Sequence, residues 1–243
     1  MKPIRFNTEE VQATLDDRKT VTRRVLKPHN TRKAKRCEYL QGEGLWFDDE
    51  INEFDKDTHI KDYSISSCWI GTEIYIQKYA SYRPGDILYV RETWQYAYDL
   101  DGNEQPIEET GRYFYAADYD SGPFGFWVNP DGTHRENMPW RPSIHMPREA
   151  ARIFLRVTDV RVERLQRICE RGRRSAHNEG FINDISLAEE TGKSATEHFS
   201  EFWDSTIKPK DRALYGWEAN PWVWVIEFER ISREEAEHEQ NKN

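Results

Sequence analysis

The residue types best suited to chemistry gather in a basic segment at positions 17–24. This segment contains Lys19 and Thr22, which are followed by Arg23 and Arg24. An ammonium close to a hydroxyl can activate that hydroxyl as a nucleophile, and adjacent guanidiniums suit a phosphate or the edge of a base. The same residues are also typical of a solvated strand end, in which the lysine pairs with a neighbouring aspartate and the threonine is an ordinary strand residue.

Aromatic side chains further along the chain are candidates for stacking on a base. Trp94, Tyr96, Trp127 and Trp140 each offer a ring, and one such stack contributes about 1–3 kcal/mol. Any one of the nine tryptophans could instead fill the core. Trp140 is the strongest binding candidate of the four, because it lies in an irregular loop with two prolines, where a core role is less natural.

The same loop, at positions 140–148, also carries His145 and Arg148. Loop residues on a rigid scaffold often carry function, and a histidine can act as an acid or a base near neutral pH. A loop histidine that is bonded to the backbone is an equal alternative. Arg91 joins the two arginines of the basic segment as a candidate for a phosphate-binding groove, although all three could be ordinary surface cations.

Cysteine and histidine usage gives no sign of a metal site. Cys37, Cys68 and Cys169 form no CxxC pair, and the seven histidines form no HExxH or His-x-His pattern. The sequence therefore predicts no metal, no cofactor and reduced thiols. It has no signal-peptide pattern and no apolar run of membrane-spanning length, so we expect a cytoplasmic protein without membrane association.

The charge of the chain limits the kind of nucleic-acid binding that can be expected. A net charge of −9 argues against high-affinity, nonspecific binding to duplexes. The charge is uneven, because residues 1–36 are rich in lysine and arginine whereas 43–62 and the tail 233–243 are acidic. A local basic groove can still bind an anion, and the acidic tail is predicted to be disordered.

The elements that must position these residues follow from apolar periodicity and turn signals. Two irregular stretches, about 29–67 and 98–138, are predicted to be insertions, the second with one candidate strand at 113–116. Pro84 and Gly85 mark a tight turn. The remaining pattern predicts helices at 9–17, 165–178 and 194–204 and strands at 4–6, 20–26, 68–77, 87–94, 153–165 and 222–231.

Short strands that are separated by glycine and proline turns, without a βαβ rhythm, favour a barrel over a doubly wound sheet. The expected fold is therefore α+β, a small mixed β-barrel with flanking helices. We expect a single domain over 1–232 that includes both insertions.

Three segments together resemble the ASCH family, in which a helix ends in Gly-x-Lys-Thr-x-Thr-x-Arg. They are the Asp-Arg-Lys-Thr-Val-Thr-Arg-Arg segment at 17–24, the Pro-Gly-Asp turn at 84–86 and the closing strand at 222–228. The Trp-Arg-Pro-Ser-Ile-His-Met-Pro-Arg loop at 140–148 and the segment at 157–165 are similar to a phage and prophage branch of that family. The resemblance implies a PUA-like barrel, a nucleobase or nucleic-acid ligand and, for a phage-encoded chain, the host cytoplasm.

The resemblance also implies one reaction. Small bacterial members of the family hydrolyse the acetyl amide of acetylated cytidine nucleosides with a lysine, a threonine and a glutamate. Lys19 and Thr22 match the first two by motif position, and Glu179, just before Gly180, is the best match for the third. The implied function is removal of an N-acyl group from a modified cytosine, in a nucleoside or in single-stranded nucleic acid.

Three alternatives remain open alongside that reaction. They are a ribonuclease that uses the same basic cleft, a non-enzymatic reader of modified bases, and an acidic phage protein that binds a host protein. The chain also departs from the family pattern, because Asp17 stands where glycine is usual and the segment 171–174 carries an internal glycine with extra cations. The sequence leaves the oligomeric state open.

Overall fold

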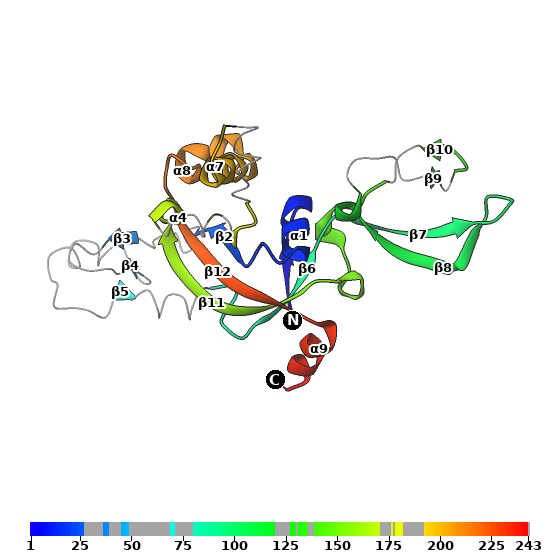
Figure 1. Ribbon diagram of the computed structural model, residues 1–243, viewed down its shortest axis with the longest axis horizontal. Coiled ribbons are helices and arrows are strands. Elements are labelled where there is room, and N and C mark those ends of the chain that lie inside the picture. Colours follow the sequence, from blue (N-terminus) through cyan, green and yellow to red (C-terminus); the bar gives the residue numbers. More distant parts are fainter. Residues whose placement is uncertain are drawn as a thin grey trace, which may run out of the picture. The chain divides into compact units, whose positions relative to one another are not determined.

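The chain folds into two compact units in the computed structural model (Figure 1). The first unit comprises Met1–Thr20, Ile87–Arg156 and Glu229–Asn243, and the second comprises Val21–Asp86 and Val157–Phe228. The structure describes residues 1–26, 36–38, 45–48, 69–70, 80–119, 127–129, 131–135, 139–170, 176, 178–181 and 192–242.

A mixed set of strands forms the centre of the first unit. Strand β1 (Lys2–Arg5) runs parallel to β6 (Ile87–Arg91), and the first residues of β11 (Phe154–Arg164) run antiparallel to β6. Leu88 and Val90 on one face of β6 are fully buried, and Ile87 and Tyr89 on the other face are each only 7% exposed. Burial on both faces explains the continuous apolar run of the strand predicted at 87–94, which ends at Arg91 in the structure.

The helix predicted at 9–17 is α1 (Thr8–Leu15), which begins with a capping box of Asn7 and Glu10. The Glu10 N–H donates to Asn7 Oδ1 at 2.8 Å, and the Asn7 N–H donates to Glu10 Oε2 at 3.1 Å. This exchange satisfies two backbone donors that the first turn would otherwise leave without a partner.

The end of α1 places an aspartate in a conformation that glycine usually adopts. Asp17 has a left-handed backbone with φ of 57°. The Arg18 N–H donates to the Ala13 carbonyl at 2.9 Å and the Asp17 N–H donates to the Thr14 carbonyl at 3.2 Å, which is a Schellman end. Glycine is favoured at such a position, but aspartate is among the few other residues that tolerate it. Arg230 holds the Asp17 carboxylate through two hydrogen bonds of 2.8 and 2.9 Å.

The prediction of a disordered acidic tail differs from the structure, in which α9 spans Arg233–Lys242. Ser232 and Glu235 exchange hydrogen bonds of 2.9 and 3.1 Å between side chain and backbone, which caps the helix. Ala236 is fully buried in an apolar cluster of the first unit that includes Phe154. The sequence predicts disorder here because charged residues dominate the segment. The two features that favour a helix, one alanine on the buried face and one cap, are weak signals beside that charge.

A two-stranded hairpin occupies much of the region predicted to be irregular (Figure 1). Strand β7 (Trp94–Leu100) pairs antiparallel with β8 (Pro106–Tyr115), with a register shift between Ala97 and Asp99. The candidate strand at 113–116 is thus the end of a longer strand. Short elements complete the described part of this unit: η2 (Ala116–Asp118), β9 (Trp127–Val128), β10 (His134–Arg135), η3 (Ser143–His145) and η4 (Arg148–Ala150).

The second unit is organised around β2 (Val21–Val25), which pairs antiparallel with β12 (Trp222–Ile231). Helix α7 (Ala195–Thr206) begins with a Ser194–Glu197 capping box and buries Phe199 and Trp203 in the core of this unit, as its sequence pattern predicts. Further elements are β3 (Arg36–Glu38), β4 (Leu45–Asp48), β5 (Trp69–Ile70), α4 (Arg167–Glu170), η5 (Pro209–Asp211) and α8 (Arg212–Tyr215).

The predicted α+β class is confirmed, but the barrel is not found. The hydrogen-bonded strand order is β1-β6-β11 in the first unit and β11-β12-β2 in the second. Over the described residues this order ends at β1 and at β2, so the sheet is not closed.

The turn at Pro84 and Gly85 is confirmed, since Gly85 has φ of 88° and the Asp86 N–H donates to the Arg83 carbonyl at 2.9 Å.

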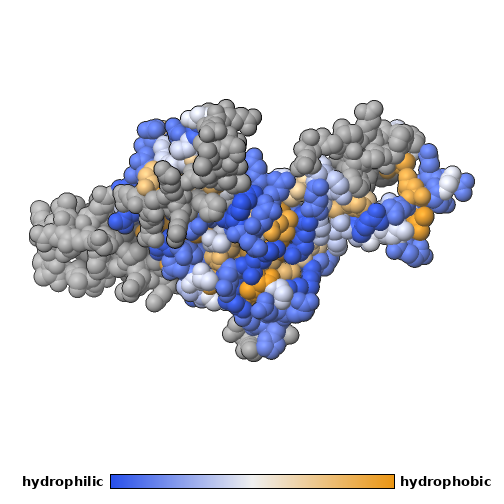
Figure 2. All heavy atoms as spheres, viewed as in Figure 1, coloured by the Kyte–Doolittle hydropathy of each residue, from blue (hydrophilic) through white to orange (hydrophobic). Residues whose placement is uncertain are grey.

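The face drawn in Figure 2 is mostly hydrophilic in its described parts. Among the described helices, none combines the length and the apolar character needed to cross a membrane.

Candidate functional site

Aromatic side chains line one face of the β7–β8 hairpin. Trp94, Tyr96 and Tyr98 alternate along β7 and therefore point to the same side, and Tyr113 on β8 lies directly opposite Tyr96. The ring centroids of Tyr96 and Tyr113 are 4.9 Å apart, those of Tyr96 and Tyr98 are 5.4 Å apart, and those of Trp94 and Tyr113 are 5.8 Å apart. We call these four residues the aromatic row.

Gly111 makes room for the aromatic row on the opposite strand. A Cβ atom at this position would lie 2.4 Å from Tyr96 Oη and 2.8 Å from Tyr98 Cε1. Both distances are far below van der Waals contact, so any side chain at position 111 would displace the two tyrosine rings. The glycine inside the strand is thus explained by a close approach of side chains.

A shallow cavity of about 620 Å³, widely open to solvent, lies beside the aromatic row. Its volume lies within the range of about 300–1,000 Å³ that is usual for small-molecule sites. The hairpin supplies most of its walls, and the loop around η4 supplies the rest. The lining residues are Trp94, Tyr96, Gly111, Arg112, Tyr113, Pro147 and Glu149.

Charged groups of both signs surround the cavity. Arg112 binds Asp99 through two hydrogen bonds of 3.0 and 3.1 Å, and these bonds raise the pKa of Arg112. The guanidinium carbon of Arg141 lies 5.3 Å from the Trp94 ring centroid. Burial raises the pKa of Tyr113, and the nearby Glu149 carboxylate raises it further. The lining of the cavity therefore combines aromatic rings with one carboxylate and with an arginine that is paired to Asp99.

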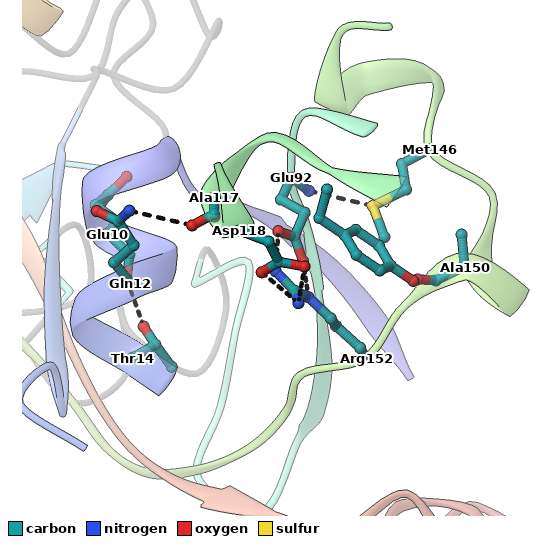
Figure 3. Close-up of polar contacts among 10 residues, drawn as sticks. Glu10, Gln12, Thr14, Glu92, Ala117, Asp118, Met146, Ala150 and Arg152 are labelled. Atoms are coloured by element: carbon teal, nitrogen blue, oxygen red, sulfur yellow. Dashed lines mark hydrogen bonds and ion pairs between the residues drawn. The ribbon is translucent and has the colours of Figure 1, made fainter. Parts of the chain in front are cut away.

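The rim that carries Glu149 is anchored on both sides. Met146 and Ala150 are both buried. The Tyr115 hydroxyl donates to the Ala150 carbonyl at 2.7 Å, and the Glu92 N–H donates to Met146 Sδ at 3.2 Å (Figure 3). These contacts hold the η4 turn in place beside the cavity.

An ion pair between the buried Glu92 and the half-buried Arg152 lies next to that anchor (Figure 3). Arg152 Nε and Nη2 each donate to Glu92 at 2.9 Å, and Arg152 Nη1 donates to Asp118 at 2.9 Å. The guanidinium carbon of Arg152 lies 4.0 Å from the Tyr115 ring centroid. Burial raises the pKa of Glu92 despite the arginine, and burial raises the pKa of Tyr115 to about 12. The two carboxylates, the arginine and the tyrosine brace the scaffold behind the rim.

Lys19, the predicted catalytic amine, belongs to the first unit and is only 3% exposed. Its Nζ lies 3.6 Å from Glu10 Oε1 and 5.5 Å from the Phe6 ring centroid. Glu10 therefore serves both the capping box of α1 and this lysine. The alternative prediction, in which Lys19 pairs with a neighbouring aspartate, is wrong. Asp16 binds Arg18, and Asp17 binds Arg230.

Thr22 and Glu179, the other two predicted catalytic residues, belong to the second unit, where they are 1% and 4% exposed. Thr22 lies opposite Ile226 in the β2–β12 ladder. Arg23 Nη1 donates to Glu179 Oε1 at 2.7 Å, and both side chains are buried. Glu179 comes just before Gly180, which has a left-handed backbone with φ of 98°. The Phe181 N–H donates to the Ala176 carbonyl at 3.2 Å, as at the glycine end of a helix.

The other predicted binding residues lie in different surroundings. Arg24 is half-buried opposite Trp224 in the second unit. Arg91, in the first unit, donates to the Ile144 carbonyl at 3.3 Å and to the Tyr89 hydroxyl at 3.2 Å.

The three residues of the predicted binding loop do not line the cavity. Trp140 packs against Tyr119, with ring centroids 6.1 Å apart. His145 is exposed, and Arg148 contacts Met1 and Gln240 near α9. Of the four aromatic residues predicted to stack on a base, Trp94 and Tyr96 line it, and Trp127 lies in β9.

Sequence reasoning missed Gly111, Arg112, Tyr113 and Glu149 as members of one site. A signal existed in the alternation of three aromatic residues along β7, followed by an Asp-Gly turn and a second aromatic segment. That pattern indicates a hairpin with one aromatic face. Nothing in the sequence indicates that the η4 turn reaches the same cavity.

Comparisons of this chain with protein-family models, with curated proteins and with solved structures find no match. Within the described residues, no three histidine, cysteine, aspartate or glutamate side chains are grouped so that they could hold a metal ion.

Proposed function

We propose that this protein binds a base of single-stranded nucleic acid in the cavity beside the aromatic row. The observation that carries the proposal is the convergence of Trp94, Tyr96 and Tyr113 on one cavity of about 620 Å³. Aromatic rings stack on bases of any sequence, because every base has a π-face. A single-stranded base can enter such a cavity without the cost of leaving a duplex.

The charges around the cavity support the same ligand class. The guanidinium of Arg141 lies against the ring of Trp94. A guanidinium close to a stacking ring suits the phosphates that join consecutive bases. The net charge of −9 restricts the basic field to such local regions, so binding is expected to be moderate and to weaken with salt.

A binding titration of the Tyr96→Ala variant tests the proposal. The readout is the fluorescence anisotropy of a labelled nine-residue RNA at low salt. We expect the Kd of this variant to rise by about 5- to 150-fold, which corresponds to a lost stack of about 1–3 kcal/mol. Tyr96→Phe keeps the ring and should bind within about twofold of the wild type. Equal binding by Tyr96→Ala and the wild type would exclude the cavity as the site.

A second candidate function is hydrolysis of an N-acyl group on a modified cytosine, in which Lys19, Thr22 and Glu179 have the roles that the ASCH resemblance gives them. The observation that favours it is the left-handed backbone of Asp17, which supplies the conformation of the motif's usual glycine. The wild type is incubated with acetylated cytidine and with unmodified RNA, with and without Mg²⁺. Release of acetate supports the hydrolase, and cleavage of the unmodified RNA selects a ribonuclease instead. If the protein binds RNA but forms neither product, the result supports a non-enzymatic reader of bases.

A further inference from the structure

Glu149 stands out among the residues that line the cavity. Its side chain is exposed, and it forms no hydrogen bond or ion pair with any residue that the structure describes. Arg112, the other charged lining residue, is already neutralised by Asp99. The Glu149 carboxylate is thus the one lining charge that keeps its hydrogen-bonding capacity for a ligand, within the described part of the chain.

The position of Glu149 is well defined by its neighbours. It is the central residue of η4, in which the Ala150 N–H donates to the Pro147 carbonyl at 3.2 Å. Ala150 is buried and accepts the Tyr115 hydroxyl at 2.7 Å. The anchored turn therefore holds the backbone of Glu149 at the edge of the cavity, from which its carboxylate can reach a ligand.

We propose that Glu149 makes the cavity selective for guanine by accepting two hydrogen bonds from its Watson–Crick edge. This inference rests on the proposed function, since it requires a base to stack on the aromatic row. A carboxylate offers two acceptor oxygens and no donor. Guanine presents two neighbouring donors, N1–H and the N2 amino group, that can bind both oxygens at once.

The other bases fit a carboxylate less well. Cytosine and adenine each present one amino group on that edge and therefore one hydrogen bond to a single oxygen. The only Watson–Crick donor of uracil lies between two carbonyl oxygens, which a carboxylate repels. The expected order of affinity is guanine first, then cytosine and adenine, and uracil last.

A cationic ligand is the main competing occupant. Aromatic rings with a carboxylate can hold a methylated ammonium group. Here, however, Arg141 lies on the Trp94 ring. Its guanidinium repels a cation, whereas it attracts the phosphates on either side of a base. The mixed charges therefore favour a nucleotide with a donor-rich base.

The test compares four labelled nine-residue RNAs that differ only at the central base, which is guanine, cytosine, adenine or uracil in a uridine background. For the wild type we expect the guanine RNA to bind about tenfold more tightly than the uracil RNA, within the discrimination typical of a bidentate base contact. In Glu149→Ala this preference should fall below about twofold, while the affinity for the all-uridine RNA stays equal or rises.

Glu109→Ala is the matched control. Glu109 is an exposed carboxylate on β8 that does not line the cavity, so its removal changes the net charge equally and should leave the preference for guanine intact. A wild type that binds all four RNAs equally overturns the role of Glu149 and leaves the proposed function standing. A wild type that binds none of them overturns both. If it then binds a trimethyllysine peptide through Glu149, the cavity holds a cation instead.

Discussion

Replacing Glu179 with alanine is expected to lower the free energy of unfolding by about 3–5 kcal/mol, the usual cost of removing one partner of a buried ion pair. Arg23 and Glu179 are both buried, and their side chains meet at 2.7 Å. Alanine would leave a buried guanidinium without the carboxylate that offsets its charge. Urea denaturation of the variant and the wild type at pH 7 measures the difference.

Two further variants show whether burial is the cause. Lys193 and Glu201 form an ion pair in the same unit, but both side chains are exposed, so Glu201→Ala should cost at most about 0.5 kcal/mol. Replacing Arg23 and Glu179 together with leucine should recover much of the loss, because neither charge of this pair is then left buried without the other. A stability close to that of the wild type in Glu179→Ala would show that the pair is dispensable, and Glu179 would then be free for catalysis.

The second large effect is expected at Glu92. Its buried carboxylate accepts two hydrogen bonds from Arg152, and Glu92→Ala should destabilise the protein by about 2–4 kcal/mol. The expected loss is smaller than at Glu179, because Arg152 is partly exposed and keeps Asp118 as a partner. Thermal or urea unfolding of this variant checks the value.

The pH dependence at Glu92 gives a sharper test of the same contact. Burial raises the pKa of Glu92 in the folded state above its ordinary value of 4.5. The folded state therefore holds the proton more tightly than the unfolded state. Protonation of Glu92 therefore stabilises the folded state. This contribution to the unfolding free energy is complete below pH 4.5 and is lost as the pH rises through the raised pKa of Glu92.

Glu92→Gln cannot ionise and should lack this loss. The unfolding free energy of the wild type minus that of Glu92→Gln should therefore decrease as the pH rises from 4.5. Denaturation at a series of pH values up to 7.5 measures it. A difference that grows in favour of the wild type with rising pH would mean that Arg152 outweighs burial.

Local patterns in the sequence predict the elements that depend on neighbouring residues. The Asn7–Glu10 capping box, the Ser194 start of α7 and the glycine at position 180 all act within one or two turns of chain. The alternating apolar residues at 153–165 and 222–231 likewise predict β11 and β12 almost to their ends. Each of these signals is complete in a short window.

Contacts between distant residues are what the sequence leaves undetermined. The Arg23–Glu179 pair joins residues that are 156 positions apart, and nothing local distinguishes it from a solvated arginine and a solvated helix end. Closure of the sheet depends in the same way on which strands form its edges, and so a barrel was expected where the strand order stays open. Trp94 borders the cavity, but it is only 5% exposed and belongs to a buried apolar cluster, so its predicted stacking on a base stays a prediction. The place of Glu149 at the cavity depends on how η4 packs beside the hairpin, which no local pattern indicates.

The division of the chain also limits how this protein can be dissected. Each unit is assembled from separate stretches, and residues 229–243 complete a unit that begins at Met1. No single cleavage can release either unit whole, and a fragment that stops before Glu229 lacks a part of the first unit. During synthesis, the first unit is complete only when residues 229–243 have left the ribosome. All of the second unit, which ends at Phe228, is synthesised before that point, so we expect the first unit to finish folding last.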